Sequence, residues 1–218
     1  VSESVWKGIA KGTGPDGDVF QLSHDEKNLY LRYQAKDAEF KNAGKDFATL
    51  FETGDAVDLM LQTGAKADEK RKTAAAGDIR FLFTEMAGKA VCVKYDYVNT
   101  KAKGEGRVFE SPVGKLKAAS VELRKDATVR IERGKGEFTL KAVVPLAALG
   151  NTDNLKATRG DIGRIKSDST GAVSVERSYW SNKATMLMSD RPTQAGVDPR
   201  FWGKFKFTGK LSEFGIDF

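Results

Sequence analysis

The chain has 218 residues and a mass of 23.8 kDa, a length that sandwiches and barrels of strands commonly use for one domain. Hydrophobic residues make up 40%, enough for a sizeable core, and the longest nearly apolar run, Ala142–Leu149, is too short to span a membrane. The 36 basic and 30 acidic residues are interspersed, with a net charge of +6, so we expect no nucleic-acid partner.

The chain begins at Val1, without an initiator Met or a signal-like apolar segment. We therefore expect residues 1–218 to form one domain that is either a trimmed mature protein or a fragment of a larger protein.

A single cysteine and a single histidine limit the chemistry of the chain. One cysteine excludes an intramolecular disulfide and a cysteine-based zinc cluster, and one histidine, His24, excludes multi-histidine metal sites. Cys92 lies in the alternating run Ala90–Tyr97, which predicts a buried structural thiol rather than a nucleophile.

Alternation of apolar and polar residues predicts strands along most of the chain. In Asn28–Ala35, the side chains of Leu29, Leu31 and Tyr33 share one face, which is typical of a half-buried strand. Nine further segments show a strand pattern: Asp55–Leu61, Ile79–Thr84, Ala90–Tyr97, Ala119–Arg124, Thr128–Arg133, Glu137–Val144, Asp161–Lys166, Ser174–Trp180 and Lys204–Phe207. Ten strands separated by turn signals indicate a sandwich or a barrel.

Helical signals are few. Pro145–Gly150 has proline at its start and glycine at its end, which predicts one short helical turn. The loops Thr63–Asp78 and Ser181–Arg200 are long for a compact domain, so we expect them to bind a ligand or to be mobile.

The segment Gly12–Gly17 matches the glycine fingerprint of dinucleotide-binding proteins. That fingerprint requires a preceding strand and a following helix, whereas here a strand-like segment, Val19–Leu22, follows. The segment is therefore predicted to be a glycine-rich turn.

Two further kinds of site, a glycosidase carboxylate pair and a haem site, each depend on two residues of the chain. Asp55 and Asp58 are three apart on a predicted strand, so their side chains point to opposite faces and do not form the carboxylate pair of a glycosidase. Met60 and His24 are residue types that ligate haem iron, but the chain has no C-x-x-C-H attachment motif.

The segment Ser178–Lys183 places Trp180 at a strand end, beside Asn182 and Lys183. An indole ring matches the apolar face of a sugar, and amides and charged groups hydrogen-bond its hydroxyls. The alternative is that Trp180 packs in the core, as we expect for Trp202.

Several segments taken together resemble a known family. The segments are Gly54–Leu59, Gly77–Phe81, Val144–Gly150, Tyr179–Asn182 and Pro199–Gly203. Their order and spacing, from about Asn28 to Phe207, resemble the family 9 carbohydrate-binding modules and their DOMON-like relatives.

The resemblance implies an all-β, antiparallel β-sandwich that binds a sugar between two aromatic rings, often at a polysaccharide chain end. It implies a non-catalytic module associated with polysaccharide breakdown, in a secreted, periplasmic or cell-surface setting. Calcium in structural loops is usual in the family, and Asp16, Asp18, Asp153 and Asp161 are candidate oxygen ligands.

The resemblance also assigns site residues. Trp180 matches the aromatic platform, Arg80 the arginine after the Gly-Asp turn, and Asp58 a position that often holds Glu. The remaining candidates are the opposing ring, Phe47 or Phe51 with Phe47 preferred, and two polar residues: Arg177, where an amide is usual, and Asn182.

Two alternatives remain open at this point. The first is a structural or protein-interaction module in which Trp180 is buried and the slot is closed. The second is a haem-binding electron-transfer domain of the DOMON type that uses Met60 with His24 or a lysine.

Overall fold

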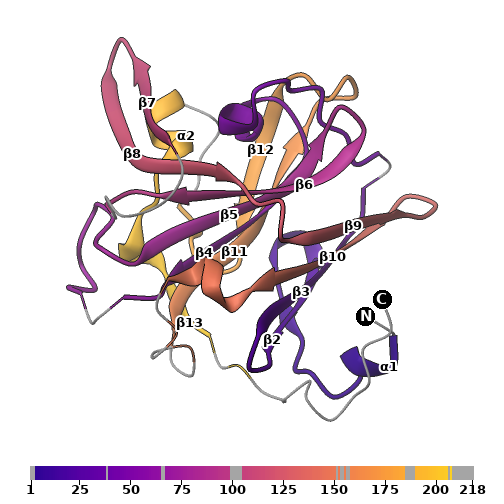
Figure 1. Ribbon diagram of the computed structural model, residues 1–218. Helices are drawn as coiled ribbons and strands as arrows, with labels where there is room; N and C mark the ends of the chain where they lie inside the picture. Colours follow the sequence, from indigo (N-terminus) through magenta and orange to yellow (C-terminus); the bar gives the residue numbers. More distant parts are fainter. Residues whose placement is uncertain are drawn as a thin grey trace.

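The chain folds into two antiparallel β-sheets that pack face to face (Figure 1). The computed structural model describes residues 3–37, 39–64, 67–98, 105–150, 152, 155, 158–184, 190–205 and 207. None of the helices in these ranges is long and apolar enough to cross a membrane.

The smaller sheet has five strands in the order β1-β2-β3-β10-β9. Their bounds are β1 Gly12–Thr13, β2 Val19–His24, β3 Asn28–Ala35, β10 Phe138–Pro145 and β9 Thr128–Arg133. The register pairs Phe138 with Ala35 and Pro145 with Asn28, so β10 runs along the whole of β3.

The larger sheet has the order β12-β11-β4-β5-β6-β8-β7, and β13 pairs with β11. Their bounds are β12 Ser174–Tyr179, β11 Arg159–Ser167, β4 Ala56–Gln62, β5 Asp78–Met86, β6 Lys89–Asp96, β8 Gly114–Leu123, β7 Glu105–Ser111 and β13 Gly203–Lys204. The hairpin β7–β8 extends away from the rest of the sheet (Figure 1).

The main core lies between the two sheets. Because successive side chains of a strand point to opposite faces, Val57, Leu59 and Leu61 of β4 all enter this core. Leu29 and Leu31 of β3 enter it from the smaller sheet. The antiparallel sandwich predicted from the sequence is confirmed.

The second face of the larger sheet, here called the outer face, is also partly covered. A second hydrophobic cluster includes Phe51, Leu82 and Tyr95, together with Ala195. The cover consists of the 3₁₀ turn η2, Phe47–Glu52, and the short helix α2, Arg191–Ala195. The side chains that β4 and β5 direct away from the main core therefore lie under these two segments.

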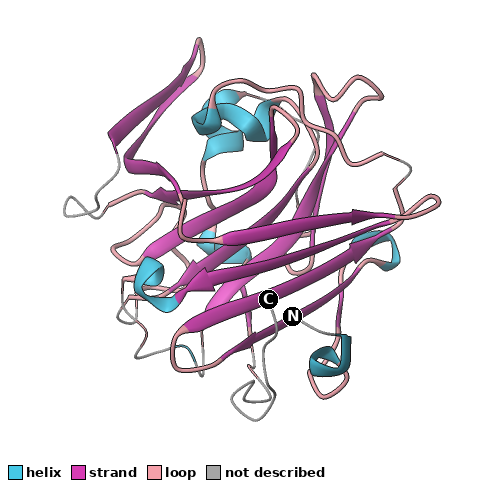
Figure 2. Ribbon diagram, turned by 45° about the vertical axis from the view of Figure 1, so that its right-hand side comes forward, coloured by secondary structure: helices cyan, strands magenta, loops and turns pink. Residues whose placement is uncertain are grey.

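The helices are short and lie at the margins of the sheets (Figure 2). Besides η2 and α2 they are α1 Glu3–Trp6, η1 Pro15–Gly17, η3 Leu146–Leu149 and η5 Pro199–Phe201.

The predicted elements agree closely with the observed ones. The strands Asn28–Ala35 and Thr128–Arg133 match β3 and β9 at both ends, and the turn predicted at Pro145–Gly150 is η3. Gly12–Gly17 holds β1 and η1 and leads into a strand, as predicted. Strand β7 and the helix α2 were not predicted, the latter because five residues carry too little periodicity to be recognised.

Candidate functional site

A buried ion pair lies at the centre of the outer face. Arg80 of β5 donates from Nε to Asp58 Oδ1 at 2.7 Å and from Nη2 to Asp58 Oδ2 at 2.9 Å. Both side chains are 0% exposed. Burial favours loss of the arginine proton, but the adjacent Asp58 carboxylate outweighs it and raises the pKa of Arg80 above its ordinary value.

Aromatic rings surround this pair. The guanidinium of Arg80 lies over the rings of Phe51 and Tyr95, at 5.2 and 5.3 Å from their centroids. The hydroxyl of Tyr179 donates to Asp58 Oδ2 at 2.6 Å. Burial, with the Asp58 charge, raises the pKa of Tyr179, so the phenol stays protonated and acts as a donor.

The helix α2 closes the ion pair from solvent. The backbone carbonyl of Gln194 accepts from Nη1 of Arg80 at 2.9 Å and from Nη1 of Arg177 at 2.7 Å. The carbonyl of Ala195 accepts from the Tyr97 hydroxyl at 2.8 Å. These carbonyls stand at the C-terminal end of α2, where a helix leaves its last acceptors without internal partners.

Local sequence explains why α2 forms there. The side chain of Asp190 caps the first turn, and Pro192 occupies a position that tolerates the missing N–H. Arg191 pairs with Glu52 of η2 at 2.6 Å, and Ala195, with its small side chain, is fully buried against the sheet. The chain's own backbone thus satisfies donors that a ligand would otherwise reach.

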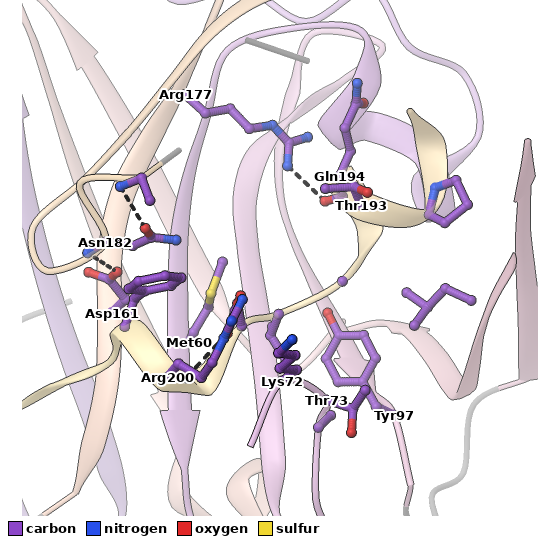
Figure 3. A pocket seen from close by; sticks show the side chains of 18 of the residues that line it. Met60, Lys72, Thr73, Tyr97, Asp161, Arg177, Asn182, Thr193, Gln194 and Arg200 are labelled. Atoms are coloured by element: carbon purple, nitrogen blue, oxygen red, sulfur yellow. Dashed lines mark hydrogen bonds and ion pairs between the residues drawn. The ribbon is translucent and has the colours of Figure 1, made fainter. Parts of the chain in front are cut away.

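Beside α2 lies a pocket of about 720 Å³, here called the outer pocket (Figure 3). Four aromatic residues contribute to its lining: Tyr97, Tyr179, Phe201 and Trp202. Its polar lining includes Asp161, Arg177, Asn182 and Arg200. Its volume falls within the roughly 300–1,000 Å³ that small-molecule sites occupy.

Asp161 of β11 shapes one side of the outer pocket. Its Oδ1 accepts from the backbone N–H groups of Ile162 and Ser181 at 2.9 and 2.8 Å, and its Oδ2 accepts from that of Asn182 at 2.8 Å. Burial raises the pKa of Asp161 to about 6, although these three hydrogen bonds act in the opposite direction. The carboxylate therefore fixes the loop that carries Asn182.

Three solved structures are similar to this chain over most of its length. One is a family 9 carbohydrate-binding module from Caldicellulosiruptor kristjanssonii in complex with glucose: 11% identity, 96% of this chain and 90% of that chain covered, TM-score 0.55. The same kind of module from that organism in complex with cellotriose has 11% identity, covers 99% and 91% of the two chains, and has a TM-score of 0.56.

The third structure is a protein from Bacteroides uniformis named for suspected carbohydrate binding, with 16% identity, 92% and 87% of the two chains covered, and a TM-score of 0.52. No protein-family model matches the chain, and no curated protein matches it in sequence. This chain has the fold of a family 9 carbohydrate-binding module. The resemblance predicted from the sequence is thereby confirmed at the level of the fold.

Within this module fold, four of the predicted site residues lie around α2. Asp58, Arg80 and Arg177 form one hydrogen-bonded group with the α2 carbonyls, and Asn182 lines the adjoining outer pocket. Asp58 and Arg80 are not exposed in it, because α2 covers them.

The two predicted aromatic rings do not face each other. Phe47 packs on the outer face, where Arg107 lies 5.8 Å from its centroid. Trp180 packs against the main core, stacked on Phe205 at 5.2 Å and edge-on to Phe20 at 5.8 Å. The larger sheet separates the two rings, so the slot predicted between Trp180 and Phe47 is absent from this structure.

Strand alternation explains why Trp180 does not lie on the outer face of the larger sheet. Tyr179 and Trp180 are neighbours, so their side chains point to opposite faces, and it is Tyr179 that reaches Asp58. The ring beside Arg80 on η2 is Phe51, the other ring considered from the sequence. Tyr179, Tyr95 and Tyr97 were missed, although the alternation in β6 and β12 carries the signal.

The candidate calcium ligands are engaged by the protein's own donors. Asp18 pairs with Arg164 at 3.1 Å and accepts from the Tyr33 hydroxyl, and Asp16 lies 3.6 Å from the same guanidinium. Among the described residues, no group of three or more His, Cys, Asp or Glu side chains is placed to hold a metal ion. Arg164 already supplies the positive charge at Asp16 and Asp18, so these residues do not fit calcium; Asp153 lies outside the described ranges.

The residues proposed for haem are far apart in the fold. Met60 lines the outer pocket on the larger sheet. His24 ends β2 in the smaller sheet and packs edge-on to Phe207 at 5.6 Å. The pairing of Met60 with His24 as axial ligands is therefore contradicted by the structure.

Proposed function

We propose that this protein binds carbohydrate in the outer pocket and does not catalyse its conversion. The observation that carries the proposal is the outer pocket itself, which combines aromatic and hydrogen-bonding side chains on one face of a fold shared with carbohydrate-binding modules. Those modules are solved with glucose and with cellotriose. The ligand class proposed here is a mono- or oligosaccharide, including the end of a polysaccharide chain.

The lining suits a sugar on chemical grounds. Phe201 is 38% exposed and offers a ring face to the apolar C–H surface of a pyranose. Arg177 and Asn182 supply the kinds of polar groups that fix hydroxyls in orientation. A monosaccharide of about 12 heavy atoms at roughly 0.3 kcal/mol each would bind with about 4 kcal/mol, in the millimolar to sub-millimolar range.

Such weak affinity is adequate for a module tethered to a partner domain, because linkage raises the effective concentration. We extend the proposal to the setting expected from the sequence: a secreted, periplasmic or cell-surface appendage of a polysaccharide-degrading enzyme. A structural calcium ion is not needed by this proposal.

One observation favours a second candidate, a structural or protein-interaction module. The Asp58–Arg80 pair is fully enclosed, and the Gln194 carbonyl occupies its free donor. A chain that serves only as a scaffold has no need to keep these groups open. The two candidates differ in whether any sugar binds.

Titration followed by amide chemical shifts tests the proposal. Glucose, cellobiose, xylose and galactose are added to high millimolar concentration to the natural sequence, to Phe201→Ala and to Val173→Ala. Val173 is 55% exposed and does not line the outer pocket, so its variant is the matched control. We expect a saturable shift that Phe201→Ala weakens about five-fold, as loss of about 1 kcal/mol of ring contact predicts.

No saturable shift with any of the four sugars would favour the interaction module. Equal weakening by both variants would show that the sugar does not bind in the outer pocket.

A further inference from the structure

The outer pocket is lined by four cations and three acids, and not every cation has an acid partner among the described residues. Its charged lining residues are Lys72, Lys115, Asp161, Arg177, Asp190, Asp198 and Arg200. The three acids are all engaged within the chain: Asp161 holds three backbone N–H groups, Asp190 caps α2, and Asp198 forms a two-point ion pair with Arg200. Among the described residues, only Asp198 is matched by a cation; Asp161 and Asp190 keep their charges, but neither forms an ion pair with Lys72 or Arg177.

Two cations of the pocket lack a carboxylate partner among the described residues. Lys115 pairs with Glu110 at 3.5 Å and Arg200 with Asp198, whereas no acid lies within ion-pair distance of Lys72 or Arg177 in those ranges. Figure 3 shows Lys72 and Arg177 among the side chains around the pocket.

Arg177 is the more unusual of the two. Its Nη1 and Nη2 donate to the backbone carbonyls of Gln194 and Phe51, but its Nε is buried without a hydrogen-bond partner. Burial, with a smaller contribution from the charge of nearby Arg80, lowers the pKa of Arg177 below its ordinary value. Asp58 pairs with Arg80, so Arg177 has no carboxylate in ion-pair contact within the described ranges.

We propose that the outer pocket selects an acidic sugar, a uronic acid residue whose carboxylate is bound by Arg177 and attracted by Lys72. This inference rests on the proposed function and names the substrate class of the same pocket. Each of the two Nη groups of Arg177 carries a second N–H besides the one that donates to a backbone carbonyl, and a partly desolvated cation without an acid partner gains more from an anion than an exposed one does. A neutral sugar offers no group that compensates this charge.

The test compares sugars that differ only in the group at C6. Binding of glucuronate and glucose, and of galacturonate and galactose, is measured by calorimetry at about 0.15 M salt, where attraction between exposed charges is largely screened. We expect each uronate to bind about ten-fold more tightly than its neutral partner, as a hydrogen bond to a charged group predicts.

Variants show which residues cause the preference for a uronate over its neutral partner. Lys72→Gln is expected to reduce the preference for glucuronate about three-fold, a typical effect of removing one exposed charge. Lys70→Gln, which removes an exposed lysine two residues away that does not line the pocket, is expected to leave the preference unchanged. Arg177→Lys keeps the charge but loses the paired donors, and is expected to reduce the preference further. Urea unfolding of each variant verifies that it is folded.

The outcomes separate the two proposals. Equal binding of glucose and glucuronate overturns the acidic-sugar inference and leaves the proposed function standing, whereas no binding of any sugar overturns both. Acetate competing as well as glucuronate, or Lys70→Gln acting like Lys72→Gln, would show attraction to any anion and overturn the inference.

Discussion

Tyr179 reaches Asp58 across a glycine. The two residues lie on strands β12 and β4, and both pair in register with Gly163 of the strand between them, β11. A Cβ atom at Gly163 would stand 2.6 Å from the Tyr179 ring and 2.0 Å from the Ser178 carbonyl oxygen. The 2.6 Å hydrogen bond from Tyr179 to Asp58 therefore depends on the missing side chain.

Gly163→Ala is expected to lower the free energy of unfolding by about 2–3 kcal/mol, because the new methyl group forces the ring and the strand apart. Urea unfolding measures the change. Gly106→Ala, in β7 of the same sheet, is the control, since a Cβ there would meet its nearest atom at an ordinary 3.4 Å. Equal effects of the two substitutions would contradict the role given to Gly163.

Asp58→Asn is expected to cost about 3–5 kcal/mol of stability, because it leaves the buried guanidinium of Arg80 without its counter-charge. Chemical denaturation of Asp58→Asn and of the double variant Asp58→Leu/Arg80→Met shows whether the loss of stability comes from the unpaired charge or from altered packing. The double variant removes both charges, so it should be more stable than Asp58→Asn. If the double variant is the less stable of the two, the ion pair is not the reason for the loss.

Trp180→Ala is expected to lower the free energy of unfolding by about 3 kcal/mol while leaving sugar binding in the outer pocket unchanged. The indole stacks on Phe205 and packs against the main core, so its removal leaves a cavity on the core side of the larger sheet rather than in the outer pocket. Denaturation and sugar titration of the same variant measure the two effects. A stable variant that has lost sugar binding would restore Trp180 as the platform.

The sequence was sufficient for most of the strands, because alternation is a local property. Leu29, Leu31 and Tyr33 could be assigned to one face of β3 before any partner strand was known. The same rule predicted that Asp55 and Asp58 do not form a pair, and their partners differ: Asp55, just before β4, accepts from the Ser167 N–H, and Asp58 within β4 pairs with Arg80.

The candidate site could not be derived in the same way, because it depends on contacts between distant segments. The carbonyl of Gln194 in α2 accepts a hydrogen bond from Arg80, which is 114 residues away in sequence, and the local sequence pattern does not predict that contact. The choice between Tyr179 and Trp180 depends on which face of β12 meets the second sheet. Both are aromatic, so the strand-end position and the resemblance selected Trp180, whereas in the structure it is Tyr179 that reaches Asp58.

Cys92 is expected to resist thiol reagents in the folded protein. It is 1% exposed, and burial raises the pKa of its thiol well above the ordinary value, so both access and thiolate formation are suppressed. Reaction with Ellman's reagent should be absent in buffer and complete in urea, following the unfolding transition. Rapid reaction of the native protein would contradict the buried structural role of Cys92.

Asp161 is expected to make stability fall as pH rises from about 4 to 7. Burial raises its folded-state pKa from 3.8 to about 6, so the folded chain binds this proton more tightly than the unfolded chain does. Its contribution is present in full below about pH 4 and is lost as pH rises through 6. Two pKa units correspond to about 3 kcal/mol at most.

Asp161→Asn isolates this contribution, because the amide does not titrate and every other ionisable group is retained. Oδ1 of the amide still accepts from the N–H groups of Ile162 and Ser181. The amide NH₂ group replaces Oδ2 and faces the Asn182 N–H, so one hydrogen bond is lost. This loss lowers the stability of the variant by an amount that does not depend on pH. Urea unfolding of both proteins at intervals between pH 4 and 7 gives the difference in unfolding free energy. That difference should shrink as pH rises, because only the natural protein loses stability from this group; a difference independent of pH would place the pKa of Asp161 near its ordinary value.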